Sequence, residues 1–236
     1  MGLDPSAVGP ACRHGTLKST VPTTTARFAD ELAALLPEDL PNRDACITGA
    51  ARHLDLIVEE NQKFNLTRIL GPREAAIKHV VDSVMPWRLF ANAKHVVDAG
   101  SGAGVPGIPL ALVLPETHFT LLESTQKKAI FLQSTVEDLG LENVDAFPER
   151  AETWLTTQPV QIVTARALAP LSRAVPLFAK ALRRGVRLLL YKGPDAENEI
   201  VQAQLDSATR RWKLSIVYSY DLPDALGSRR IVEIGR

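Results

Sequence analysis

The segment with the clearest chemical pattern is 95–109, where three glycines alternate with other residues directly after an apolar run. Gly100, Gly102 and Gly104 let the backbone pass close to a ligand, and they supply positive φ angles where a tight turn needs them. Pro106 suits the first turn of a helix, because the initial amides of a helix need no intrahelical partner. The pattern predicts a strand, a glycine turn and a helix, with a ligand outside the carboxyl end of the strand.

Two kinds of ligand fit this turn, and a turn without a ligand would not require three alternating glycines. Gly102, Gly104 and Gly107 match the G-x-G-x-x-G pattern of dinucleotide sites, and Glu123 stands where that pattern has its ribose-binding acid. The alternative is the D/E-x-G-x-G-x-G loop of S-adenosylmethionine enzymes, which begins here at Asp98. In that interpretation Glu123 also accepts hydrogen bonds from ribose hydroxyls.

The charge of Asp98 favours the second interpretation. A carboxylate two residues before the first glycine would repel the pyrophosphate of a dinucleotide. The same carboxylate would attract the ammonium group of a methionine moiety, directly or through water. The loop therefore favours S-adenosylmethionine, although the glycines alone fit both ligands.

The surrounding chain indicates an α/β fold that positions this loop. Short apolar runs alternate with helical patterns, which is typical of a parallel sheet covered on both faces, and the last two strands could pair antiparallel. The pattern from Arg27 to Phe90 is helical. We expect a leader over 1–25, a helical extension over 26–92 and a cofactor-binding domain over 93–236. The predicted strands are 95–98, 118–122, 143–147, 161–165, 186–191, 213–220 and 231–234, and the predicted helices are 105–113, 125–139, 171–182 and 196–209.

Composition limits the compartment and the partners. Lysine and arginine number 27, as do aspartate and glutamate, so the formal net charge is zero. A protein that holds nucleic acid by bulk electrostatics is usually basic, so any RNA contact must come from local patches. The cysteines are Cys12 and Cys46, without metal-ligand spacing, and no apolar run could span a membrane. We expect a cytoplasmic protein without a metal, and nothing requires more than a monomer.

The wider sequence resembles one family closely over roughly residues 27–236, the bacterial small-subunit ribosomal RNA methyltransferases called RsmG or GidB. The segments that carry the resemblance, in order, are Asn61, Asn65-Leu-Thr, His79-Val-Val-Asp-Ser, Asp98-Ala-Gly-Ser-Gly-Ala-Gly-Val-Pro-Gly-Ile-Pro, Leu121-Leu-Glu-Ser, Arg150-Ala-Glu, Ala165-Arg-Ala-Leu-Ala-Pro-Leu and Tyr191-Lys-Gly. Departures from the family pattern lie away from the glycine loop, at Glu60, Arg184 and Glu233.

The resemblance implies a Rossmann-like methyltransferase with a mostly parallel seven-stranded sheet, whose last strand is antiparallel, and an N-terminal helical extension. It implies transfer of a methyl group from S-adenosylmethionine to N7 of one guanine in the decoding-region loop of 16S rRNA. The cofactor contacts that follow, together with those from the loop argument, are Asp98, Gly100, Gly102, Gly104, Val105, Glu123, Ala151, Glu152 and Arg166.

The reaction needs no general base, because guanine N7 carries an exposed lone pair and no proton. We therefore expect no indispensable acid–base residue, and catalysis by proximity, orientation and electrostatic stabilisation. A dinucleotide-dependent oxidoreductase remains an alternative, but no Tyr-x-x-x-Lys pair follows the fourth predicted strand. A non-catalytic RNA-binding module is another alternative, but it predicts a broken loop or a lost ribose carboxylate.

Several polar residues could contact RNA phosphates near the mouth of the site. His79, Asp82 and Ser83 lie on one predicted helix, where bracing that helix is as good an explanation as RNA contact. The other candidates are Lys192, Arg229 and Arg230, together with a cluster of Lys63, Arg68, Arg73 and Lys78.

Overall fold

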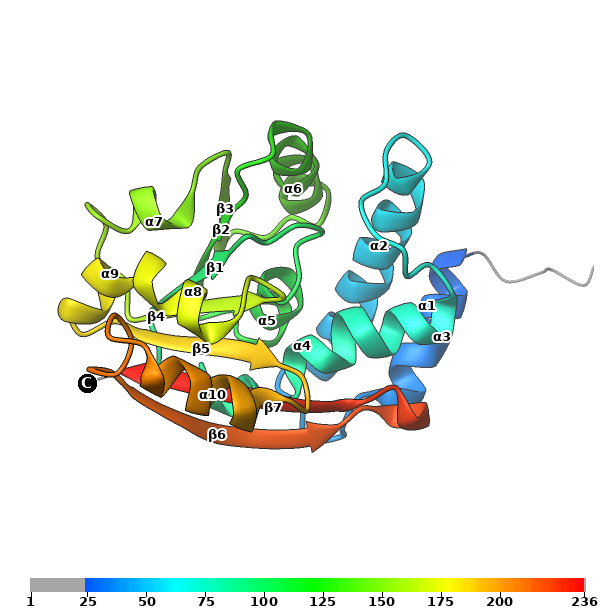
Figure 1. Ribbon diagram of the computed structural model, residues 1–236. Coiled ribbons are helices and arrows are strands. Elements are labelled where there is room, and N and C mark those ends of the chain that lie inside the picture. The colour runs from blue at the N-terminus through cyan, green and yellow to red at the C-terminus, as the bar shows by residue number, and fades with distance from the viewer. Residues whose placement is uncertain (1–23, 236) are drawn as a thin grey trace, which may run out of the picture.

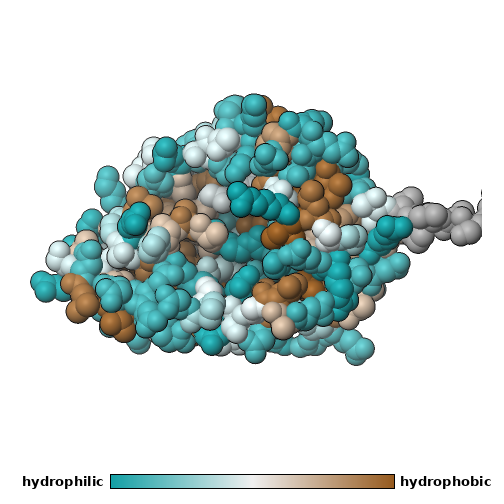
Figure 2. Space-filling view, turned by 45° about the vertical axis from the view of Figure 1, so that its right-hand side comes forward, coloured by the Kyte–Doolittle hydropathy of each residue, from teal (hydrophilic) through white to brown (hydrophobic). Residues whose placement is uncertain are grey.

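The structure is a computed structural model that describes residues 24–235. The predicted leader over 1–25 lies outside the described residues except for its last two positions, which begin helix α1 (Thr24–Leu35). Within the described residues, no helix combines the length and apolar character that crossing a membrane requires. Figure 2 shows a face on which hydrophobic side chains gather in separate groups among hydrophilic ones.

Seven strands form one sheet in the order β3-β2-β1-β4-β5-β7-β6. The first five strands are parallel, whereas β7 pairs antiparallel with both β5 and β6. The predicted mostly parallel sheet with an antiparallel last strand is therefore confirmed, as is the Rossmann-like class. The strands are β1 (His95–Ala99), β2 (His118–Leu122), β3 (Val144–Phe147), β4 (Ile162–Arg166), β5 (Arg187–Lys192), β6 (Lys213–Asp221) and β7 (Ser228–Gly235).

Both faces of the sheet are covered, which explains why the strands are apolar without alternation. Val96 and Val97 point to opposite faces of β1, and both are fully buried, each in a different core cluster. The first cluster includes α5 (Gly107–Val113), α6 (Gln126–Asp138) and the N-terminal helices. The second includes α7 (Ala151–Trp154), α8 (Leu171–Leu177), α9 (Ala179–Arg183) and α10 (Ala196–Leu205).

The helix predicted over 171–182 is two helices, and the prediction of one continuous helix was wrong. Pro176 lies inside α8 and lacks the amide that would continue the hydrogen-bond ladder. The chain leaves helical geometry at Phe178, with φ −99° and ψ 10°, before α9 begins. The short helix α7 was not predicted, because four residues are too few to show a helical period.

The N-terminal helices lie beside the carboxyl end of β5 (Figure 1). Helix α2 (Arg43–Asn61) packs against α1 and α5. A second helical segment runs through α3 (Pro72–Ala75), the π-helix η1 (Ala76–Val81) and α4 (Asp82–Val84). Two 3-10 turns, η2 (Trp87–Leu89) and η3 (Pro223–Ala225), complete the elements. Because these helices share a core cluster with the sheet, they bring His79 and Asp82 to the edge where the glycine loop lies.

Candidate active site

The loop between β1 and α5 carries the three alternating glycines. Gly100, Gly102 and Gly104 have φ angles of 73°, 59° and 86°, in the left-handed region that residues with a Cβ rarely adopt. The amides of Gly100 and Ser101 donate to the Leu122 carbonyl at 2.8 and 3.2 Å, which ties the loop to the end of β2. The strand, turn and helix predicted from the glycine pattern are thus present, at the carboxyl edge of the sheet.

Asp98 lies beneath this loop. Its side chain is fully buried, and Oδ2 accepts a 2.9 Å hydrogen bond from the Gly107 amide at the start of α5. Burial raises the pKa of Asp98 to about 6. Oδ1 has no hydrogen-bond partner within residues 24–235, and a buried acceptor of this kind is normally satisfied by water or a ligand. One carboxylate oxygen therefore remains for a cofactor group or a bridging water.

Glu123 joins the end of β2 to the glycine loop. Its Oε2 accepts a hydrogen bond of 3.1 Å from the Gly102 amide, and its Oε1 accepts one of 2.7 Å from the Thr125 amide. Each carboxylate oxygen can accept more than one hydrogen bond, so both retain capacity for ribose hydroxyls. The carboxylate thus shapes the loop as well as offering acceptors beside it.

A cavity of about 200 Å³ opens next to the loop. It brings Gly100 together with Ala151 and Glu152, the first residues of α7, and their contact with a cofactor stays a prediction. Leu168 and Leu177 add apolar walls, and such walls with a few polar groups at the rim suit a nucleoside. Val105, another expected contact, is buried in the loop, and its amide donates to Ser101 at 3.2 Å.

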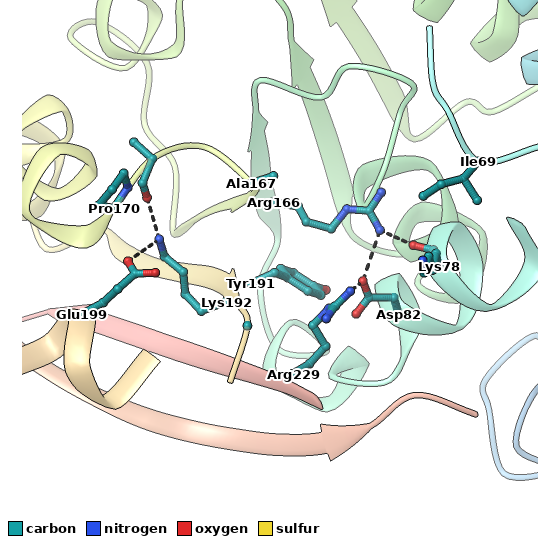
Figure 3. A pocket seen from close by; sticks show the side chains of 12 residues that line it. Ile69, Lys78, Asp82, Arg166, Ala167, Pro170, Tyr191, Lys192, Glu199 and Arg229 are labelled. Carbon is teal, nitrogen blue, oxygen red and sulfur yellow. Dashed lines mark hydrogen bonds and ion pairs between the residues drawn. The ribbon is translucent and has the colours of Figure 1, made fainter. Parts of the chain in front are cut away.

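A larger cavity of about 530 Å³ lies on the other side of the segment that follows β4 (Figure 3). Ala167 and Ala169 line the larger cavity, whereas Leu168 between them lines the smaller one. Arg166 lies in the larger cavity and not among the residues lining the smaller one. Asp82, Lys192 and Arg229 also line it, so three of the predicted RNA contacts and one predicted cofactor contact share this space.

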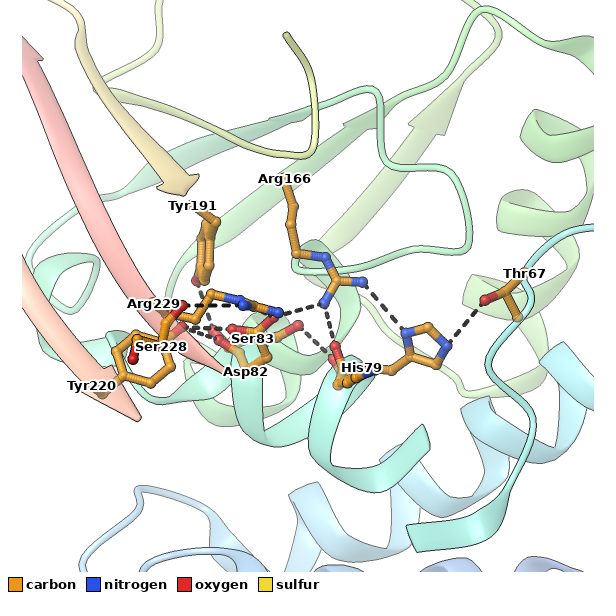
Figure 4. Close-up of polar contacts among 10 residues, drawn as sticks. Thr67, His79, Asp82, Ser83, Arg166, Tyr191, Tyr220, Ser228 and Arg229 are labelled. Atoms are coloured by element: carbon orange, nitrogen blue, oxygen red, sulfur yellow. Dashed lines mark hydrogen bonds and ion pairs between the residues drawn. The ribbon is translucent and has the colours of Figure 1, made fainter. Parts of the chain in front are cut away.

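Asp82 is the centre of a buried polar cluster at the floor of that cavity (Figure 4). Its Oδ2 accepts hydrogen bonds from Arg229 Nε at 3.1 Å and from Arg166 Nη1 at 3.4 Å. The Tyr220 hydroxyl donates to Oδ1 at 2.9 Å. Arg166 also donates to the Lys78 carbonyl. Two guanidinium groups thus compensate one buried carboxylate and hold β4 and β7 against the N-terminal helices.

His79 and Ser83 are part of the same brace. The Ser83 hydroxyl donates to the His79 carbonyl at 2.5 Å, and the Tyr191 hydroxyl donates to the Ser83 carbonyl at 2.7 Å. Burial and the nearby Arg166 lower the pKa of His79 to about 3, so the ring is neutral. Because Asp82, His79 and Ser83 are all buried, the contacts described for them are those of a structural brace. Their contact with RNA stays a prediction.

The basic residues near the site are mostly engaged by carboxylates. Lys192 lies 2.7 Å from Glu199, and Arg230 lies 3.4 Å from Glu197. Arg68 is exposed, and within the described residues it has no carboxylate within 4 Å. The other members of the predicted cluster are paired as Lys63 with Glu60, Lys78 with Glu74, and Arg73 with both Glu31 and Asp224.

His53 contacts the glycine loop, and the sequence analysis missed it. The fully buried side chain extends from α2, and its Nε2 lies 2.8 Å from the Ala103 carbonyl oxygen. Burial lowers the pKa of His53 to about 4, so the ring is neutral and Nε2–H donates to that carbonyl. The sequence feature that could have indicated this contact is the position of His53 on the buried face of the helix, next to Leu54.

These features define the class of the protein. The chain has a glycine loop after β1 and an acid at the end of β2, and its antiparallel β7 lies between β5 and β6. This combination of site and topology is that of an S-adenosylmethionine-dependent methyltransferase. The O-methyltransferase of Bacillus cereus, solved in complex with SAH, is similar with a TM-score of 0.56 at 16% identity, covering 90% of this chain and 98% of that chain. The tRNA methyltransferase TrmK of B. subtilis is similar with a TM-score of 0.53 at 13% identity, covering 67% of each chain.

The chain belongs to the GidB family, rRNA small subunit methyltransferase G, whose pattern it matches over residues 47–225. It is 70% identical over 207 residues to the ribosomal RNA small subunit methyltransferase G of Solibacter usitatus, covering 88% of this chain and 99% of the relative. It is 35% identical to the protein of the same name from Carboxydothermus hydrogenoformans, covering 77% of this chain and 79% of the relative. The expected family is confirmed, and the choice between the two ligands falls on S-adenosylmethionine.

Proposed function

We propose that the protein transfers a methyl group from S-adenosylmethionine to N7 of one guanine in the decoding-region loop of 16S rRNA, in the cytoplasm. The observation that carries the proposal is the pair of cavities on either side of residues 166–170. The smaller cavity has apolar walls for the cofactor and lies beside the loop whose Gly102 amide donates a hydrogen bond to Glu123. The larger cavity is lined by four cationic side chains and two carboxylates, and it is wide enough for a base.

The cofactor would bind along the carboxyl edge of β1 and β2. Glu123 offers acceptors for the ribose, and Ala151 and Glu152 border the far side of the cavity. The free oxygen of Asp98 would meet the ammonium end through the loop or a water. Arg166 lines the larger cavity, and we propose that it reaches the carboxylate of the methionine moiety from there. Gly100, Gly102, Gly104 and Val105 complete the predicted contacts.

The residues of this chain need only position and polarise the reactants. The cofactor supplies an activated methyl group on a sulfonium, and N7 attacks it without first losing a proton. The walls of both cavities hold the two reactants in line and exclude water, which lowers the entropic part of the barrier.

RNA would approach over the rim of the larger cavity. We propose that Arg68, which is exposed, and Arg230, which is half-buried and does not line the cavity, contact phosphates directly. Lys192 and Arg229 lie deeper and would contact the extruded nucleotide, since both line the cavity. For His79, Asp82 and Ser83 we propose an indirect role, in which they fix the positions of Arg166 and Arg229.

The test is methyl transfer from labelled S-adenosylmethionine to small ribosomal subunits that lack the modification, with the labelled nucleotide mapped. We expect one N7-methylguanine in the decoding-region loop, and we expect Gly102→Ala to abolish it. Gly140→Ala is the matched control, because Gly140 has a φ of 60° and lies away from both cavities. Labelling of another base or atom would refute the proposed target. Cofactor binding without any RNA labelling would refute the substrate and leave the methyltransferase class intact.

A further inference from the structure

The larger cavity contains two carboxylates, Asp82 and Glu199. Both oxygens of Asp82 already accept hydrogen bonds from protein groups, and only 1% of its side chain is exposed. Glu199, on α10, is 26% exposed, and its engaged oxygen is Oε2. Within residues 24–235 no group donates to Glu199 Oε1. Of the two carboxylates in this cavity, Glu199 is therefore the one with an oxygen, Oε1, that can accept a hydrogen bond from a ligand.

The environment of Glu199 holds its carboxylate in one orientation. The Leu171 amide, at the start of α8, donates to Oε2 at 3.0 Å, and Lys192 Nζ donates to the same oxygen at 2.7 Å. Lys192 is itself fixed by a 2.5 Å hydrogen bond to the Ala169 carbonyl. In Figure 3, Lys192 and Glu199 lie across the cavity from Arg166 and Asp82. Two donors on one oxygen leave the other oxygen fixed and without a partner.

We propose that Glu199 Oε1 recognises the acceptor base by its Watson–Crick edge, and so makes the cavity specific for guanine. Guanine presents two adjacent donors on that edge, N1–H and the 2-amino group, and an ionised carboxylate is an acceptor only. Adenine presents the acceptor N1 at the equivalent position, so it would face Glu199 with two acceptors opposed. This inference rests on the proposed function, which places the base in this cavity.

The geometry of N7 transfer leaves that edge available for recognition. N7 and O6 form the other edge of guanine, and N7 must face the cofactor cavity to react. The remaining hydrogen-bonding groups of the base are then free for the cavity wall, as in other enzymes that extrude a nucleotide. A fixed carboxylate discriminates well, because a base lacking the matching donors leaves the Oε1 acceptor without a hydrogen bond in the filled cavity.

The experiment is a cycle of two changes, one in the protein and one in the base. Full-length wild type and Glu199→Gln are assayed on small-subunit RNA carrying guanosine or inosine at the mapped position. Inosine keeps N7 and N1–H but lacks the 2-amino group. The Gln variant keeps an oxygen for the Leu171 amide, so the fold is preserved, but it places an amide donor towards the base. Glu197→Gln, on the exposed face of α10, is the matched control.

We expect inosine to lower kcat/KM of the wild type and of Glu197→Gln by at least ten-fold, through a weaker base contact. We expect Glu199→Gln to lower kcat/KM on guanosine by a similar factor and to respond less than three-fold to inosine. The affinity for S-adenosylhomocysteine and the midpoint of thermal unfolding should match the wild type. If the two changes are multiplicative, Glu199 does not contact the 2-amino group and the inference is wrong. If the wild type forms no N7-methylguanine at all, the proposed function itself fails first.

Discussion

Replacing Asp82 with asparagine tests whether the brace between β4, β7 and the N-terminal helices depends on its charge. The asparagine side chain has nearly the same shape, so no cavity is created. It leaves Arg166 and Arg229 facing a neutral group in a place where Asp82 is 1% exposed. Breaking a buried ion pair by removing one partner costs about 3–5 kcal/mol. The two arginine side chains are 19% and 23% exposed, so water relieves part of that cost and about 3 kcal/mol is expected.

The assay is urea unfolding followed by circular dichroism, with Asp39→Asn as the matched control. Asp39 pairs with Arg88 at 2.6 Å, but both side chains are more than 60% exposed, so this change should cost about 0–1 kcal/mol. A loss of about 3 kcal/mol is a large share of the 5–15 kcal/mol that holds a typical domain together. An Asp82→Asn variant that unfolds within about 1 kcal/mol of the control would refute a role of the charge in the brace.

Three further predictions concern the glycine loop and its supports. A Cβ at Gly107 would overlap the Leu121 side chain, so Gly107→Ala should destabilise the fold by about 1–3 kcal/mol in the same urea assay, and an unchanged midpoint would contradict this packing. Glu123→Ala removes the acceptor for two backbone amides beside the cofactor cavity, so calorimetry should show at least ten-fold weaker binding of S-adenosylhomocysteine; equal affinity would exclude the ribose role. Because burial lowers the pKa of His53 to about 4, its contribution to stability is complete above about pH 6.5 and is lost as the pH falls towards 4. His53→Gln should remove about 2 kcal/mol of the pH dependence of the free energy of unfolding between pH 7 and pH 5, and a curve equal to that of the wild type would exclude His53 as the cause.

The sequence was sufficient for the type and chain order of the central strands because β1, β2, β4 and β5 are buried on both faces. A strand such as β2 (His118–Leu122) reads as a continuous apolar run between turn residues, and its bounds were predicted without error. The position of β7 between β5 and β6 was not predicted, since pairing partners depend on contacts far apart in the chain. The break at Phe178 was missed because an apolar period continues across it.

The site was predictable where a backbone conformation demands a particular residue. The positive φ angles at positions 100, 102 and 104 favour glycine, so the turn is visible in the sequence as three alternating glycines. The role of Glu199 could not be predicted in this way. A glutamate on the polar side of a helical pattern looks the same in the sequence whether its side chain faces solvent or a cavity. His53 was missed for the opposite reason, since a single histidine within an apolar face is most simply explained by packing.

The arrangement of β6 and β7 has a consequence for the order of folding. Strand β6 pairs only with β7 among the described strands, so it joins the sheet only after a strand that follows it in the chain has docked on β5. Local opening is then expected to release the two strands together as one cooperative unit. Since Tyr220 and Arg229 belong to this hairpin, each opening event would also detach the brace at Asp82. Amide hydrogens of β6, β7 and α4 should therefore exchange with solvent at a common rate, faster than those of β1.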